Sequence, residues 1–118
     1  MTVNPSFRTF VLEQLGRVVN NVRGRGMFGG VGIYSGNLFF ALLDDDTLYF
    51  KVDDSTRGDF EARGLAPFRP YGPEGEEMQY YGVPAELLED ADALRGWAEK
   101  AVEVARRAKL GPARRGHQ

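Results

Sequence analysis

The side chains that could exchange protons or attack a substrate near neutral pH are scarce in this sequence. There is no cysteine, and the single histidine, His117, is the last residue but one. Ser6, Ser35 and Ser55 therefore have no histidine partner in the body of the chain, and nothing positions a serine beside Lys51 to form a Ser–Lys pair. Because general acid–base and nucleophilic catalysis both need such groups, we expect a protein that is not an enzyme.

Aspartates supply the one set of side chains suited to a metal. The run from Asp44 to Asp46 and the pair Asp53-Asp54 carry the oxygen ligands that calcium and magnesium prefer. Their spacing lacks the pattern of an EF-hand loop, and consecutive aspartates point in different directions. Turn and helix-cap roles account for both clusters, so we expect neither a metal nor a cofactor.

A glycine-rich run offers a nucleotide-binding pattern in the wrong context. Gly24-Arg25-Gly26-Met27-Phe28-Gly29 has the spacing G-x-G-x-x-G, which in dinucleotide-binding proteins follows a strand and opens a helix. Here a helical pattern precedes the glycines and strand patterns follow them, so no helix N-terminus is available for a phosphate. We expect Gly29, Gly30 and Gly32 to shape a sharp bend between bulky residues instead.

The elements that must position these residues follow from hydrophobic spacing and turn signals. Asn4-Pro5 is typical of a helix start, and apolar residues then recur at spacings of three and four as far as Val19. Ser35-Gly36-Asn37 and the aspartate run match hairpin turns, which predicts an antiparallel meander. The expected strands are residues 22–34, interrupted by glycines, 38–43, 47–52, 67–71 and 78–81. The expected later helices are a short one that contains Phe60 and ends at Gly64, and a region from Pro84 that breaks near Asp90 and ends at Gly111-Pro112.

Length and composition bound the class of protein. A chain of 118 residues fits one domain, here residues 1–110, followed by a basic tail at 111–118. The first residues lack an export signal, no apolar run is long enough to span a membrane, and the absence of cysteine suits a reducing compartment. We therefore expect a cytoplasmic protein without a membrane partner.

Charge is distributed unevenly along the chain. The formal net charge is -2, but residues 1–25 carry +3, residues 106–118 carry +5 and the remainder carries -10. If the two basic ends lie side by side, they would form a positive face for nucleic acid, although such ends are often solvated tails. The candidate nucleic-acid contacts are Arg106, Arg107, Lys109, Arg114 and Arg115.

Several short motifs, in order, resemble the N-terminal domain of the TfoX/Sxy proteins, which regulate natural competence in bacteria. The resemblance spans residues 7–108, and the chain ends where the second domain of the competence regulators would begin, so we expect a stand-alone domain. It implies an α+β fold of two layers, with helices packed on an antiparallel sheet of about five strands in the order α-β-β-β-α-β-β-α, similar to secretion chaperones. The matching residues are Arg25 to Tyr34, Phe39-Phe40-Ala41, Leu48 to Asp53, Phe60, Gly64, Pro67-Phe68, Met78 to Tyr81, Pro84, Leu94 and Trp97.

Aromatic residues supply a candidate surface for a protein partner. Neighbours on a strand face opposite sides, so at least one ring of Tyr80-Tyr81 should lie away from the helix-covered core, exposed for a partner or a second copy. We expect a non-enzymatic, regulatory interaction domain, with a role in transcriptional regulation as the implied context and weak nucleic-acid binding through the basic ends as the alternative. The candidate partner surface comprises Met27, Phe28, Gly29, Gly30, Lys51, Tyr80 and Tyr81.

Overall fold

The first helix begins where its capping residue predicts. The Asn4 side-chain oxygen accepts a hydrogen bond from the Ser6 N–H at 2.8 Å, and Pro5 is the first helical residue. The computed structural model describes residues 4–27, 29–70, 72 and 78–115, and of Met27 and residues 111–115 it describes the backbone alone. The elements are α1 (Pro5–Gly16), β1 (Val22–Met27), β2 (Gly30–Ser35), β3 (Leu38–Asp44), β4 (Thr47–Lys51), α2 (Arg57–Ala62), β5 (Tyr80–Gly82), α3 (Ala85–Leu88) and α4 (Ala91–Arg115).

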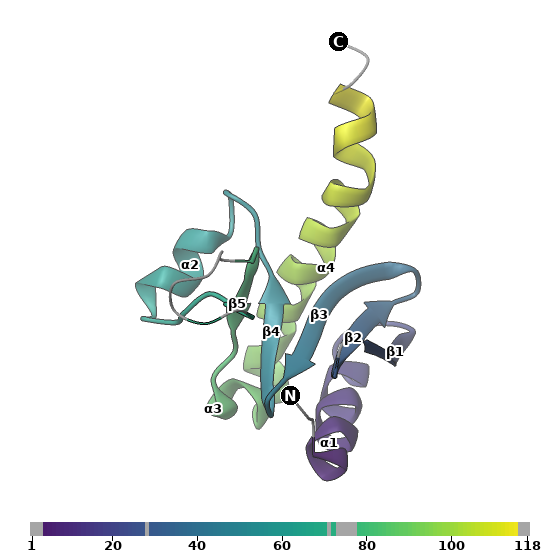
Figure 1. Ribbon diagram of the computed structural model, residues 1–118, viewed down its shortest axis with the longest axis vertical. Helices are drawn as coiled ribbons and strands as arrows, with labels where there is room; N and C mark the ends of the chain where they lie inside the picture. Colours follow the sequence, from purple (N-terminus) through teal and green to yellow (C-terminus); the bar gives the residue numbers. More distant parts are fainter. Residues whose placement is uncertain (1–3, 28, 71, 73–77, 116–118) are drawn as a thin grey trace.

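The five strands form one antiparallel meander in the order β1-β2-β3-β4-β5, as the short connections predict (Figure 1). Turns with positive φ join the first four strands. Gly29 has φ 83° between β1 and β2, and Gly36 has φ 62° between β2 and β3. Asp45 and Asp46, with φ 53° and 57°, form the turn between β3 and β4, which confirms the hairpin reading of the aspartate run.

Two strand predictions need correction. The expected strand over residues 22–34 is a hairpin of two strands, because the glycines form its turn. The expected strand over residues 67–71 is reduced to one bridge between Pro67 and Tyr81, flanked by backbone bonds from the Phe68 N–H to the Tyr80 oxygen and from the Gly82 N–H to the Ala66 oxygen. Proline lacks the N–H that a full ladder needs. The observed order is therefore α-β-β-β-β-α-β-α-α, still with five strands.

Helices α1 and α4 cover one face of the sheet. Helix α4 packs on β3 and β4, while α1 lies beside both β1 and α4 (Figure 1). A β-bulge between β2 and β3 leaves Phe40 as an extra residue and places its ring in the core, 6.1 Å from that of Phe50. The largest fully buried side chains are Phe40, Phe50, Phe60, Leu15, Ile33, Leu43, Leu48, Leu94, Val11, Val52 and Val104.

The last helix starts as expected and ends later than expected. Asp90 separates α3 from α4, and its side chain accepts a hydrogen bond from the Ala93 N–H at 3.2 Å. The predicted end at Gly111-Pro112 is wrong, since α4 continues to Arg115 through the start of the expected tail. Residues 106–110 are exposed, so the carbonyl that Pro112 leaves without an N–H can bond to water. None of the helices in the described ranges is long and apolar enough to cross a membrane.

Candidate functional site: the outer face of the sheet

The strands present two faces of different chemistry. Ile33, Ala41 and Phe50 align across β2, β3 and β4 and are fully buried under the helices. Except at the bulge, where Phe40 also points into the core, their neighbours along each strand point the opposite way, to a side against which no helix of the described residues packs (Figure 1). We call this side the outer face, and it comprises Arg23, Tyr34, Phe39, Leu42, Tyr49, Lys51, Phe68 and Tyr80.

A row of aromatic rings crosses the outer face between two cations. The rings of Tyr34 and Phe39 stack with centroids 5.1 Å apart, and Phe39 lies 5.9 Å from Tyr80. The Arg23 guanidinium sits 5.0 Å from the centroid of Tyr34, and the Lys51 ammonium sits 5.0 Å from that of Tyr80. Tyr34 and Phe39 remain half-buried, so part of each side chain stays accessible to a partner.

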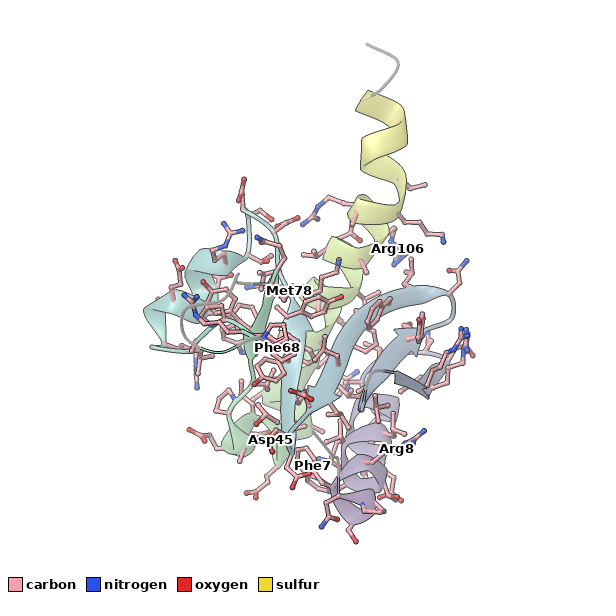
Figure 2. The ribbon with its side chains drawn as sticks, viewed as in Figure 1. Phe7, Arg8, Asp45, Phe68, Met78 and Arg106 are labelled. Carbon is pink, nitrogen blue, oxygen red and sulfur yellow. The ribbon has the colours of Figure 1, made fainter. Side chains whose placement is uncertain are left out.

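A second aromatic pair lies beside this row. The ring of Tyr49 on β4 meets that of Phe68 at a centroid distance of 4.7 Å, and both side chains are half-buried. Phe68 comes from the segment that pairs with the edge of β5, and Figure 2 shows it in front of the strands. Burial raises the pKa of the Tyr49 hydroxyl, as does the charge of Asp44, so Tyr49 stays neutral at physiological pH.

Lys51 is a half-buried cation that forms no ion pair with any acidic side chain the structure describes. In the part of the chain that the structure describes, its one polar side-chain contact is the Tyr80 hydroxyl, 3.5 Å from the ammonium nitrogen. Burial lowers the pKa of Lys51. Burial also raises the pKa of Tyr80 to about 12, and the nearby Tyr34 adds to that effect. A cation that has lost water and gained no carboxylate is a favourable contact for an incoming carboxylate or carbonyl oxygen.

The Ser–Lys arrangement does not form with two of the three candidate serines. The Ser35 hydroxyl donates to the Asn20 carbonyl oxygen at 2.7 Å, and the Ser55 hydroxyl donates to Asp53 at 2.7 Å. The third, Ser6, lies on α1 and not on the outer face. Lys51 therefore has no described serine beside it to activate.

The predicted partner surface is divided between two ends of the sheet. Lys51 and Tyr80 pair at the end of β4 and β5, whereas Met27 and Gly30 pair at the far end of the sheet, beside the β3–β4 turn. Phe28 and the side chain of Met27 lie outside the described residues. The structure therefore brings Lys51 and Tyr80 together and leaves Met27, Gly29 and Gly30 apart from them.

The two adjacent tyrosines face opposite sides of the sheet, as strand geometry predicts, but the expected exposed ring is absent. Tyr81 faces the helices, is 4% exposed and donates its hydroxyl hydrogen to Glu61 at 2.7 Å. Tyr80 lies on the outer face and is 6% exposed, because Phe39 and Lys51 pack against it. The partly exposed rings of the aromatic row are those of Tyr34 and Phe39 instead.

The glycines at the first turn have an architectural role. Gly29 takes a positive φ, and a Cβ added at Gly30 would lie 2.4 Å from the backbone oxygen of Leu43 on β3. Only glycine permits that approach between β2 and β3. Strand, turn and strand enclose these glycines, so the turn reading is confirmed and no helix follows them.

Two of the candidate nucleic-acid contacts are engaged with acids. Arg106 pairs with Glu103 at 3.2 Å, and Arg107 pairs with Asp53 at 2.8 Å. Lys109 is exposed, while the side chains of Arg114 and Arg115 lie outside the described residues. Arg106 also lies far along the long axis from Arg8 on α1 (Figure 2), so these two arginines do not share a face.

The contact between Arg107 and Asp53 joins α4 to the turn before α2. Arg107 also reaches the Ser55 hydroxyl at 3.1 Å, while the Ser55 N–H donates to Asp53 at 3.0 Å. Burial raises the pKa of Asp53, but the hydrogen bonds from Ser55 and Arg107 outweigh it and bring the pKa to about 2. Arg107 thus has a structural role, because it links α4 to the turn before α2.

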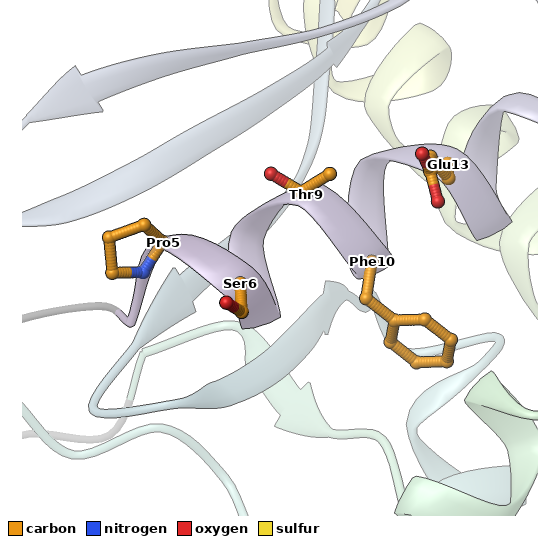
Figure 3. Close-up of a pocket in the computed structure, with 5 residues that line it drawn as sticks. All are labelled: Pro5, Ser6, Thr9, Phe10 and Glu13. Atoms are coloured by element: carbon orange, nitrogen blue, oxygen red, sulfur yellow. The ribbon is translucent and has the colours of Figure 1, made fainter.

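Other candidate ligand sites are weak. Within the described residues, no group of three or more His, Asp or Glu side chains is placed to hold a metal ion. A hollow of about 380 Å³ lies along α1 and is lined by Pro5, Ser6, Thr9, Phe10 and Glu13 (Figure 3). All five residues come from one helix. The residues that line the hollow therefore include no second element that could enclose a ligand.

The sequence did not reveal the contribution of Phe39 to the outer face. Residues 38–43 are uninterruptedly apolar, so alternation could not assign their faces. The bulge at Phe40 then shifts the register and pairs Phe39 with Tyr34. The adjacent phenylalanines were a visible signal, but their opposite environments depend on the bulge.

Comparison with known proteins identifies the family of this chain. Comparison with curated proteins returns no match. The family model described as the TfoX N-terminal domain matches residues 13–105, which cover all five strands, the end of α1 and more than half of α4. This chain therefore belongs to the TfoX N-terminal domain family.

Proposed function

We propose that this chain is a non-enzymatic, regulatory protein-interaction domain that acts in the cytoplasm and contacts its partner through the outer face of the sheet. The observation that carries the proposal is the half-buried row of Tyr34 and Phe39 between the cations Arg23 and Lys51, on a face that no described helix covers. Aromatic and arginine side chains supply much of the binding energy in protein interfaces. The resemblance to competence regulators favours transcriptional regulation as the setting.

Matched substitutions on the outer face and on α1 test the proposal. Phe39→Ser removes the centre of the aromatic row, while Phe10→Ser removes a ring that is 37% exposed on α1, away from the sheet face. Each folded variant serves as bait in a native lysate, and quantitative mass spectrometry identifies a protein that the parent chain captures. We expect Phe39→Ser to lose that protein and Phe10→Ser to retain it, with calorimetry on the purified pair as confirmation.

Equal capture by both variants, with circular dichroism showing intact folds, would contradict the proposal. Direct nucleic-acid binding through the basic ends is the competing function. It requires cations that the ion pairs of Arg106 and Arg107 already occupy. A titration with fluorescent single-stranded and duplex DNA at low and moderate salt separates the two, because phosphate-driven binding weakens steeply with salt.

A further inference from the structure

The two edge strands of the sheet, β1 and β5, differ in whether other backbone groups cover them. The edge of β5 is covered, since Ala66 and Phe68 bond to its backbone. Strand β1 pairs with β2 on one side, and no described residue bonds to its backbone on the other. An edge strand with free N–H and carbonyl groups is a template for another extended chain.

The hydrogen-bond pattern identifies which groups of β1 are free. The Gly36 N–H donates to the Asn21 oxygen, so in the register Val22↔Ser35 the next bonded pair is Arg23 with Tyr34. Arg23 and Arg25 therefore direct their backbone groups toward β2. Val22, Gly24 and Gly26 direct theirs outward from the sheet.

Arginines flank this edge on both faces. Arg23 and Arg25 are exposed and alternate with the glycines, which places them on the outer face. Arg8 of α1 reaches the opposite side of β1, where its Nη2 atom lies 3.5 Å from the position of a Cβ on Gly24, and Figure 2 shows Arg8 on the side of α1. The ion pairs between described residues involve Arg57, Lys100, Arg106 and Arg107, so none of these three arginines is paired with a described carboxylate. The Arg23 side chain does donate a hydrogen bond from its Nε to the Gly36 carbonyl oxygen at 3.3 Å.

The two glycines of β1 differ in the space beside them. A Cβ on Gly24 would meet Val31 at 3.1 Å and Leu12 at 3.3 Å, so the core fills that position. At Gly26 the nearest described atom to such a Cβ is the Gly30 oxygen, 4.0 Å away. An added strand thus finds room beside Gly26 for a side chain on the helix side of the sheet.

Charge selects the occupant of the edge. Antiparallel pairing with a second copy through β1 would bring Arg23 and Arg25 against the same arginines, and like charges on neighbouring strands repel. The same pair attracts carboxylates placed two residues apart on an incoming strand. The arginines therefore oppose self-association at β1 and favour an acidic partner.

We propose that β1 accepts an extended segment of a partner protein, with acidic residues at alternate positions, as an added strand at the edge of the sheet. The inference rests on the proposed function in that the partner is a protein. The edge adjoins the aromatic row at Arg23, whose guanidinium also lies over the Tyr34 ring, but its ladder groups belong to β1 alone. The backbone groups of Val22, Gly24 and Gly26 form the ladder. Arg23 and Arg25 bind the carboxylates, and the space beside Gly26 receives a side chain on the opposite face.

A labelled seven-residue peptide of alternating valine and glutamate is the probe. Fluorescence anisotropy at low salt measures its affinity, and amide hydrogen exchange by NMR reports the ladder. We expect exchange to slow at Gly24 and Gly26, whose N–H groups gain partners, and to change little at Arg23 and Arg25, whose N–H groups are already bonded to β2. A peptide held by charge alone would slow none of them.

Matched variants isolate the backbone from the charge. Gly26→Pro removes an outward N–H without breaking a bond to β2, and Gly26→Ala is its control because the space there is open. We expect Gly26→Pro to weaken binding at least about fivefold, as the loss of one backbone hydrogen bond implies. Gly26→Ala should stay within about twofold on the same scale. Arg25→Glu should weaken binding and favour a peptide with lysine in place of glutamate, whereas Arg95→Glu on α4 should do neither.

Equal affinities for Gly26→Pro and Gly26→Ala, or slowed exchange confined to other strands, would overturn the inference. Concentration-dependent dimerisation that Gly26→Pro abolishes would overturn it in favour of a second copy. Phe39→Ser separates this inference from the proposed function, since it should leave peptide binding intact while it removes the partner captured from the lysate. If Phe39→Ser loses capture but the parent chain binds no peptide, the proposed strand addition at β1 is wrong and the proposed outer-face function stands. If the peptide binds but Phe39→Ser captures its partner as before, the outer-face function is wrong and the strand addition stands.

Discussion

The two faces of this sheet use the same strands for different purposes. On the helix-covered face, Ile33, Leu43 and Phe50 are fully buried, and Tyr81 has its hydroxyl bonded to Glu61. On the outer face, Tyr34 and Phe39 are half-buried and have a cation close to each end of their row. The helix-covered face excludes water. The outer face holds large rings that water still reaches. Stability and recognition are therefore expected to respond to different residues of the same strands.

The largest effect should come from the covered face. Phe50→Ala removes a fully buried ring that contacts Phe40. We expect it to lower the free energy of unfolding by about 3–5 kcal/mol through lost burial and a residual cavity. Urea unfolding followed by circular dichroism measures the change. A loss below about 1 kcal/mol would mean that the core can close around the missing ring, and the contrast between the faces would be weak.

Backbone packing between β2 and β3 should give the next effect. Gly30→Ala places a methyl group 2.4 Å from the Leu43 oxygen, a backbone atom that can move only with its strand. We expect a loss of about 1–3 kcal/mol from this overpacking. Gly26→Ala, with no clash, is the matched control. Similar thermal midpoints for the two alanine variants would contradict the close approach of β2 to β3.

The outer face should contribute less to stability. Phe39→Ala removes two ring contacts from a half-buried side chain. We expect about 1 kcal/mol, the scale of aromatic pairs, measured in the same urea experiment as Phe50→Ala. A loss as large as that of Phe50→Ala would show that the aromatic row is a second core, and it would remove the basis for assigning the outer face to recognition.

The smallest effect on stability should come from the ion pair of Arg107 with Asp53, which joins α4 to the turn before α2. The pKa of Asp53 is lowered to about 2 from 3.8, so its contribution is complete above pH 3.8 and disappears as the pH falls toward 2. Both partners are substantially exposed, so Arg107→Ala should cost below about 1 kcal/mol at pH 7 after solvent screening. NMR titration of the Asp53 carboxyl carbon should show its pKa rise in Arg107→Ala. An unchanged pKa would mean that Ser55 alone stabilises the carboxylate, while Arg106→Ala provides a neighbouring control.

Local signals in the sequence were sufficient for most of the architecture. The Asn4-Pro5 helix start, the glycine turn at Gly29 and the aspartate hairpin each depend on residues a few positions apart, and all three were predictable. The extent of the strands was harder to predict, because the segment around Pro67 forms a single bridge where a full strand was expected. The end of α4 was also missed, since Gly111-Pro112 can remain helical where its neighbours are exposed.

The candidate site depended on contacts between distant parts of the chain. The sequence by itself determined the helices, the meander and the supply of aromatic and basic residues, because turn geometry and alternation act over short separations. Only the tertiary structure decided that the bulge sends Phe40 inward and Phe39 outward, that Tyr80 is buried, and that Arg107 is held by Asp53. Each of these outcomes depends on which surfaces pack together, and the separation of 54 residues between Asp53 and Arg107 lies far beyond the reach of any local pattern.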